Sequence, residues 1–206
     1  MKIDRIEVRF VEAELDQPFG WSQRWTNTRS LVVLKVFTDH GIVGWGETYG
    51  SLESVAAIAS VARLAIGENP ENISQIWHKI HRATFQSHMY TGAAVMAASA
   101  IDTALHDILG KSTGKPVAEV MGGRLHDSIA VYATGLYYVD NYALPPHLEE
   151  AAGYVEQGFT GMKMKVGALS LKEDADRVRA TRKAIGPDVR LMFDANESYD
   201  PSSALT

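Results

Sequence analysis

The sequence predicts an α+β part built on an antiparallel sheet, followed by a part in which strands and helices alternate. In the first part, two runs of β-branched and apolar residues flank a turn at residues 38–41, which is typical of a β-hairpin. In the second part, predicted strands start at intervals of roughly 30 residues, the length of one βαβ unit. Three strands alternating with helices indicate a parallel sheet, either doubly wound or closed as a barrel.

The chain is expected to begin with a strand over residues 3–14, where apolar and charged residues alternate. Pro18 and Gly20 are expected to end this strand. Residues 20–28 then form a polar loop that carries Trp21 and Trp25. Two tryptophans in a loop pack against their own domain more often than against a ligand, and a loop that covers a pocket is the alternative interpretation.

The predicted hairpin pairs residues 30–37 with residues 42–48. Thr48 and Tyr49 follow at the exit of the second strand, where side chains can reach a neighbouring site. Apolar residues at helical spacing then predict a series of helices, over residues 51–67, 72–83, 92–110 and 117–123.

The second part is predicted to contain three strands, at residues 129–133, 162–166 and 189–194, separated by helices at residues 145–157 and 170–185. Ser170 and Glu173 have the spacing of a capping box at the start of the second of these helices. Asp200 and Pro201 are typical of another helix start, which would run to Thr206. Polar groups end two successive strands, which favours a barrel, because barrel chemistry gathers at the carboxyl ends of the strands.

The strongest functional signal is the pair Lys163 and Lys165 together with Asp194 and Asn196. Alternate side chains of a strand point to the same side, so the two lysines are expected to project together, as are Asp194 and Asn196. Repulsion between two ammonium groups and loss of water both lower a lysine pKa. A lysine of this kind acts as a base or nucleophile near neutral pH. Asp194 is expected to be an ion-pair partner or a metal ligand.

The composition narrows the class of protein. The 206 residues are 46% hydrophobic and carry a net charge of −5, which gives no reason to expect nucleic acid or an anionic membrane as a partner. There are no cysteines, which suits a cytoplasmic protein. No apolar run approaches the roughly 20 residues of a membrane span.

The length bears on the predicted barrel. An eight-unit barrel needs ~250 residues by itself, whereas this chain has room for only three units after the α+β part. We therefore expect the sequence to be part of a longer protein.

The combined motifs resemble the mandelate racemase/muconate lactonizing branch of the enolase superfamily, along essentially the whole chain. The resemblance is carried by four motifs: Gly44-Trp-Gly-Glu47, Ala100-Ile-Asp-x-Ala-Leu-x-Asp-Ile-x-Gly-Lys111, Lys163-x-Lys165 and Leu191-x-x-Asp194-x-Asn196. It implies an α+β capping domain over residues 1–123 and, over residues 124–206, the first part of a (β/α)7β TIM-like barrel. Among the branches of the family, the sequence looks most like members that act on acid sugars.

The resemblance also implies a reaction. A base removes the proton next to a substrate carboxylate, and Mg2+ stabilises the enediolate that results, giving racemisation, epimerisation, dehydration or cycloisomerisation. Lys165 would be the base, Lys163 would lower the pKa of Lys165, and Asp194 would be the first of three metal carboxylates. Substrate contacts are expected at Asn196 and at the capping-segment residues Trp21, Trp25, Thr48 and Tyr49. The partners implied are a small carboxylate substrate and further copies of the chain in a homo-oligomer.

Two alternatives remain at this point. Lys165 could form a Schiff base with a ketone or aldehyde in a different kind of barrel enzyme. If the native chain ends at Thr206, it would instead be a non-catalytic fragment, because a single metal carboxylate is too few for tight Mg2+ binding. A fragment of this kind would also expose an open strand edge.

Overall fold

The computed structural model describes residues 1–88 and 91–205, which form two compact units. The first unit comprises Met1–Ala13 and Arg29–Asp127, and the second comprises Glu14–Thr28 and Ser128–Thr206. Thr206, the expected end of the last helix, lies outside the described residues. The second unit therefore contains one segment from early in the chain in addition to the alternating strands and helices.

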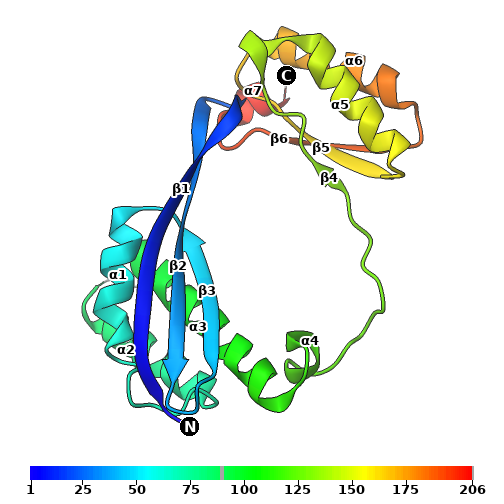
Figure 1. Ribbon diagram of the computed structural model, residues 1–206. Helices are drawn as coiled ribbons and strands as arrows, with labels where there is room; N and C mark the ends of the chain where they lie inside the picture. Colours follow the sequence, from blue (N-terminus) through cyan, green and yellow to red (C-terminus); the bar gives the residue numbers. More distant parts are fainter. Residues whose placement is uncertain (89–90, 206) are drawn as a thin grey trace. The chain divides into compact units, whose positions relative to one another are not determined.

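The first unit is built on a sheet of three strands in the order β1-β2-β3 (Figure 1). Its strands and helices are β1 (Ile3–Trp21), β2 (Arg24–Thr38), β3 (Val43–Tyr49), α1 (Leu52–Ala62), α2 (Ile73–Gln86), α3 (Ala93–Thr113) and α4 (Val117–Val120). β2 and β3 pair antiparallel, with Val33 opposite Glu47, which confirms the predicted hairpin. The far ends of β1 and β2 belong to the second unit.

The prediction that residues 20–28 form a loop was wrong. β1 continues through Pro18 to Trp21, and β2 begins at Arg24, so that only Ser22 and Gln23 form the turn. Proline is tolerated there because β1 is an edge strand, which does not need every N–H for its ladder. Near the end of this edge strand, the N–H of Gly20 donates a hydrogen bond to the carbonyl of Tyr138, at 2.7 Å.

The core of the first unit lies between the sheet and the helices. Val32, Leu34 and Val36 alternate along β2 and are fully buried against the apolar side of α3. Gly44 and Gly46 allow β3 to approach α3 closely, because a Cβ at either position would collide with a backbone carbonyl of that helix. The alanine-rich sequence of α3 serves the same close packing.

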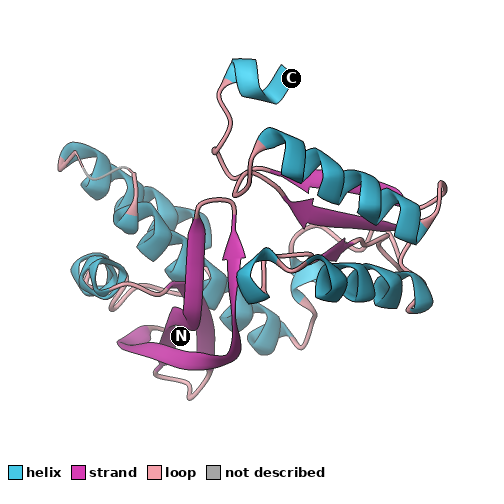
Figure 2. Cartoon of the chain, turned by 90° about the horizontal axis from the view of Figure 1, so that it is seen from above, coloured by secondary structure: helices cyan, strands magenta, loops and turns pink. Residues whose placement is uncertain are grey.

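The second unit contains a parallel sheet in the order β4-β5-β6 with helices packed against it. Its elements are β4 (Ala133–Thr134), a short 3₁₀ helix (Asp140–Tyr142), α5 (Leu144–Glu156), β5 (Gly161–Lys165), α6 (Leu171–Ile185), β6 (Arg190–Asp194) and α7 (Pro201–Leu205). Helices α5 and α6 run alongside each other, and strands of the sheet are visible between them in Figure 2. The capping box of Ser170 and Glu173 at the start of α6 is confirmed.

One side of β5 faces these helices. Met162 and Met164 are fully buried there and pack in a cluster that includes Ala151 of α5 and Ile185 of α6. Since strand side chains alternate, Lys163 and Lys165 lie on the opposite side of the same strand. The helical layer thus fixes the sheet from one side and leaves the lysines on the other.

The first strand of this sheet is much shorter than the predicted strand at residues 129–133. In the parallel ladder, Ala133 lies opposite Met162, which is the second residue of β5. One residue earlier, Tyr132 is level with Gly161, where β5 begins. Residues before Tyr132 therefore have no residue of β5 opposite them. Ile129 and Val131 are accordingly exposed. The sequence pattern was apolar, but the register of the neighbouring strand limited the pairing.

Across the two described stretches, none of the helices combines the length and the apolar character that a membrane crossing requires.

Candidate active site

The carboxyl ends of β5 and β6 bring three charged side chains together. The parallel register places Lys165 directly opposite Asp194. The Nζ atoms of Lys165 and Lys163 lie 2.7 Å and 3.1 Å from Oδ2 of Asp194. The two-residue period of β5 explains why both lysines reach one carboxylate. We call Lys163, Lys165, Asp194 and Asn196 the lysine–aspartate cluster.

Asn196 completes this cluster from the segment after β6. Its side-chain oxygen accepts a hydrogen bond from Lys165 at 2.6 Å, and its backbone N–H donates to Oδ1 of Asp194 at 3.1 Å. Asn196 has a φ of 43°, in the left-handed region that asparagine adopts more readily than most residues. This backbone turn directs the amide back toward the lysine.

The cluster is partly open to solvent, and the exposure differs between the lysines. The side chain of Lys165 is 7% exposed, that of Lys163 is 24% exposed and that of Asp194 is 27% exposed. Tyr137 contributes to the cover of Lys165, because the amine lies 5.6 Å from the centre of the tyrosine ring. A small molecule could therefore reach the carboxylate and Lys163 most directly.

The electrostatics of the cluster are dominated by the carboxylate. The hydrogen bond from Lys165, with a further one from Lys163, lowers the pKa of Asp194 to about 2. The hydrogen bond to Asp194 raises the pKa of Lys163. The expectation of a lowered pKa was therefore wrong for Lys163, because the hydrogen bond to the Asp194 carboxylate outweighs the effect of desolvation.

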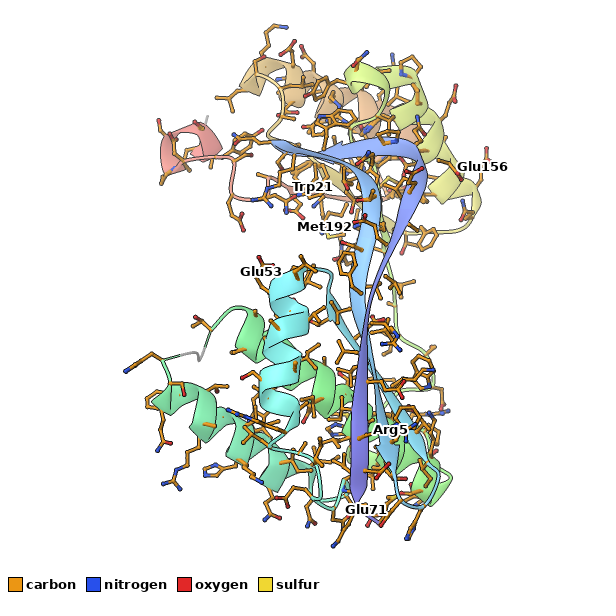
Figure 3. All side chains as sticks on the ribbon, turned by 60° about the vertical axis from the view of Figure 1, so that its left-hand side comes forward. Arg5, Trp21, Glu53, Glu71, Glu156 and Met192 are labelled. Carbon is orange, nitrogen blue, oxygen red and sulfur yellow. The ribbon has the colours of Figure 1, made fainter. Side chains whose placement is uncertain are left out.

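The tip of the β1–β2 hairpin, residues 14–28, lies in the same unit as the cluster. Ser22 is buried, and its hydroxyl donates to the carbonyl of Val166 at 2.9 Å and lies 3.5 Å from the Asn196 side-chain oxygen. Figure 3 shows Trp21 at this tip and Met192 on β6, where Met192 shares its side of the strand with Asp194.

Trp21 and Trp25 both make aromatic contacts with their own unit. Trp21 lies 5.9 Å from Phe19, measured between ring centres, and is half-buried. Trp25 packs edge-on against Tyr142, with its indole N–H 3.4 Å from the tyrosine hydroxyl. A pocket of about 300 Å³ is lined by residues of the hairpin turn and of the loop after β6, namely Trp21, Ser22, Gln23, Arg24, Asn196, Glu197 and Ser198. Trp21 and Asn196 thus line one pocket, whereas Trp25 does not line it.

No sequence pattern indicated Ser22 or Tyr137 as site residues. Ser22 contacts residues 144 and 174 positions further along the chain, so no local pattern could indicate its partners. Tyr137 follows β4 in a segment without regular structure. Both were found only through the tertiary fold.

Thr48 and Tyr49, the other predicted substrate contacts, belong to the first unit at the end of β3. They line a separate pocket of about 610 Å³ together with residues of β2 and α3, among them Leu31 and Met96. Tyr49 is 79% exposed. Its side chain is thus free to contact a ligand.

The cluster offers partial support for a divalent metal. Asp194 supplies a partly exposed carboxylate, which is the kind of ligand that Mg2+ takes, often with only one or two carboxylates from the protein. Within residues 1–88 and 91–205, no group of three or more His, Cys, Asp or Glu side chains could hold a metal ion. The described residues therefore fit one ligand position and do not form a complete metal site.

Comparisons with known proteins agree with this architecture. Residues 5–122 match the mandelate racemase / muconate lactonizing enzyme N-terminal domain, and residues 147–206 match the enolase C-terminal domain-like family. D-galactarolactone cycloisomerase of Agrobacterium fabrum is 35% identical over all of this chain and 54% of its own length. Arabinonate dehydratase of Saccharolobus solfataricus is 37% identical over 85% of this chain and 48% of its own length.

A solved structure shows the same fold. The crystal structure of 3,6-anhydro-D-galactonate cycloisomerase from Zobellia galactanivorans matches all of this chain and 54% of its own length, with a TM-score of 0.87 and 35% identity. The chain spans about half the length of the relatives it matches. The parallel sheet is therefore part of a barrel rather than of a doubly wound domain, and the predicted fold class is confirmed. The chain belongs to the mandelate racemase/muconate lactonizing enzyme family of the enolase superfamily.

Proposed function

We propose that the full-length protein removes the proton next to the carboxylate of a hydroxy acid, an acid sugar or its lactone. The single observation that carries this proposal is the meeting of two lysine amines and one carboxylate at the ends of neighbouring parallel strands. The product of the first step is an enediolate. Its collapse gives racemisation or epimerisation, dehydration or cycloisomerisation, according to the groups that the substrate carries.

Lys165 is the proposed base. Its amine lone pair takes the proton, while the electron pair of the broken C–H bond moves onto the carboxylate carbon and oxygens. Burial and two hydrogen bonds hold this amine in one place, which is the property that general-base catalysis needs. Lys163, whose pKa is raised, is the proposed cation that offsets charge on the substrate carboxylate.

Asp194 is the proposed ligand for Mg2+, and Asn196 is the proposed contact for a substrate oxygen. A bound Mg2+ would stabilise the negative charge that develops on the substrate carboxylate. Trp21 and Arg24 line the pocket beside Asn196, so they are proposed to contact the substrate from the hairpin tip. Trp25, Thr48 and Tyr49 remain proposed contacts on the basis of family resemblance.

The comparisons support an acid-sugar substrate. The relatives reported above are named for a galactarolactone, an arabinonate and an anhydrogalactonate, which are all sugar acids or their derivatives. We further propose that the protein acts in the cytoplasm as a homo-oligomer, and the absence of cysteines suits a reducing compartment.

The test is a screen of the full-length protein against aldonic acids, aldaric acids and their lactones in deuterium oxide. Proton NMR should show exchange of the proton next to the carboxylate in the presence of Mg2+ and none after treatment with EDTA. Replacement of Lys165 by Ala should abolish exchange on one face of the substrate, a loss of about 10²-fold or more. The matched control is Lys172→Ala, because Lys172 is 85% exposed on α6 and should leave exchange unchanged.

The same samples distinguish the Schiff-base alternative. Borohydride added with the substrate should leave the mass of the protein unchanged if Lys165 acts as a base. A covalent adduct on Lys165, or exchange that persists in the Lys165→Ala variant, would contradict the proposal.

A further inference from the structure

A second group of polar side chains lies behind the lysine–aspartate cluster, between β5 and the helices. We call Asp174, Arg177, His147, Thr181 and Tyr138 the buried polar network. All five residues are buried. Asp174 and Arg177 come from α6, His147 from α5 and Tyr138 from the segment after β4.

Asp174 connects the segments that follow three neighbouring strands. Its Oδ1 accepts from the Tyr138 hydroxyl after β4, at 2.8 Å. Its Oδ2 accepts from the backbone N–H of Gly167 after β5, at 2.7 Å, and from the Tyr199 hydroxyl after β6, at 3.0 Å. The carboxylate of Asp174 therefore links the three segments that follow β4, β5 and β6.

Arg177 holds the backbone of the proposed base directly. Its Nη1 donates to the carbonyl oxygen of Lys165 at 3.1 Å, and its Nη2 lies 2.9 Å from Nδ1 of His147. Its guanidinium also lies over the Tyr138 ring, 4.2 Å from the ring centre. Since an arginine only donates, Nδ1 of His147 must accept, and His147 then donates from Nε2 to Thr181 at 2.8 Å.

The backbone from Lys165 to Gly167 is therefore held at three successive points by side chains. Arg177 binds the carbonyl of Lys165, Ser22 binds the carbonyl of Val166, and Asp174 binds the N–H of Gly167. Gly167 has a φ of 98°, a conformation that other residues rarely adopt, so this turn has a defined shape. The direction of the Lys165 side chain follows from this fixed backbone.

Stability is a weak explanation for such a network. Buried ion pairs are often no more stabilising than apolar residues of the same size. Nε of Arg177 is buried without a hydrogen-bond partner among the described residues, which carries a free-energy penalty. Apolar packing could join α6 to β5 without that penalty, whereas only donors and acceptors can fix individual carbonyl and N–H groups.

We propose that Asp174 and Arg177 are positioning residues, which fix the backbone at the end of β5 so that the Lys165 amine stays at Asp194 and Asn196. This inference rests on the proposed function, because it assigns a role in placing the proposed base. A misplacement of about 1 Å can reduce a catalysed rate by about 10²-fold. The pair therefore controls the rate of proton removal without touching the substrate.

The first experiment measures the position of Lys165 without requiring enzymatic activity. The folded chain is treated briefly with acetic anhydride, and the acylation rates of Lys165 and of the exposed Lys172 are compared by mass spectrometry. Asp174→Asn and Arg177→Met should raise the Lys165 rate several-fold relative to Lys172. Asp176→Asn is the matched control on the same helix, with an exposed side chain, and should leave the Lys165 rate unchanged.

The second experiment uses the full-length protein and the exchange assay. Arg177→Met should lower kcat by about 10-fold to 10²-fold with little change in KM. Arg177→Lys keeps a donor for the Lys165 carbonyl and should recover part of the loss. Tyr199→Phe removes one hydroxyl from Asp174 in a partly buried position, so it serves as a milder variant if the others fail to fold.

The outcomes are separable. Unchanged Lys165 acylation in folded Asp174→Asn, Arg177→Met and Tyr199→Phe would overturn the positioning role even if the proposed function holds. Absence of exchange in the unmodified full-length protein would overturn the proposed function, while the acylation result would still decide whether the network positions Lys165. Amide hydrogen exchange of β5 identifies the variants that are folded.

Discussion

Two groups of charged residues meet at the carboxyl end of β5, one on each side of the strand. The lysine–aspartate cluster lies on the side away from the helices, and its Asp194 carboxylate is 27% exposed. The buried polar network lies on the helical side, where the side chains of Arg177 and Asp174 are 6% and 4% exposed. Both groups pair acids with bases, but only the first is open to a small molecule.

The difference indicates separate tasks for the two groups. Charges that remain partly hydrated can exchange partners at little cost, so the lysine–aspartate cluster can open to a substrate or a cation. Separating a fully buried ion pair costs the folded protein far more free energy, because the remaining charge has no water to solvate it. The buried polar network is therefore expected to keep its partners. Lys165 connects the two groups, because its amine belongs to the lysine–aspartate cluster and its carbonyl accepts a hydrogen bond from Arg177 of the buried polar network.

The comparison predicts that substitutions in the two groups lower the free energy of unfolding by different amounts. Tryptophan fluorescence during urea unfolding can measure these amounts. The chain has four tryptophans, of which Trp45 and Trp77 lie in the first unit and are partly exposed. In a background where both are replaced by Phe, the remaining Trp21 and Trp25 report urea unfolding of the second unit. Arg177→Ala, His147→Gln and Asp194→Asn are each made in this background.

The largest effect is expected for Arg177→Ala. Removing one partner of a buried ion pair leaves Asp174 without its counter-charge, so the free energy of unfolding should fall by about 3–5 kcal/mol. Arg179→Ala is the control, because Arg179 is 72% exposed two residues later on the same helix, and its replacement should leave the unfolding midpoint unchanged. Equal losses in both variants would show that burial does not make the ion pair of Arg177 more important for stability than an exposed pair.

The next effect concerns pH. Burial, with a smaller contribution from the Arg177 charge, lowers the pKa of His147 from 6.5 to about 4. Between pH 4 and pH 6.5, His147 is therefore protonated in the unfolded chain but neutral in the folded chain. Its contribution to the free energy of unfolding is fully present above about pH 6.5. As the pH falls from 6.5 to 4, about 3 kcal/mol should be lost.

His147→Gln, which does not titrate, should flatten this part of the pH profile of urea unfolding. His78→Gln is the control, because His78 is exposed on α2 and should leave the profile unchanged. A profile for His147→Gln that is as steep as that of the parent chain would show that His147 is not the group that titrates.

The smallest effect is expected for Asp194→Asn. Both lysines lose their carboxylate partner, but Asp194 and Lys163 are partly exposed and water can replace the lost contacts, so the free energy of unfolding should fall by only about 2 kcal/mol or less. Urea unfolding at neutral pH measures this change beside that of Arg177→Ala. A loss for Asp194→Asn as large as for Arg177→Ala would mean that the lysine–aspartate cluster is also a structural ion pair, which would weaken the proposed function.

Much of the fold followed from local patterns. The Ser170 capping box and the alternation of apolar residues along β2 each reflect a constraint within one element. The long β1 strand and the short β4 strand were not predicted correctly. The length of each strand depends on partners that lie far away in sequence. Gly20 of β1 is bridged to Tyr138, and β4 can pair only where β5 lies beside it, from Gly161 onward.

The sequence by itself determined which side chains leave the ends of β5 and β6 together, because the two-residue period of a strand is a local property of the backbone. Only the tertiary structure decided how those side chains are held. The carboxylate of Asp194 raises the pKa of Lys163, and the backbone behind Lys165 is fixed by Arg177, Asp174 and Ser22. Those effects depend on distances between residues remote in sequence, and such distances exist only once the second unit has folded.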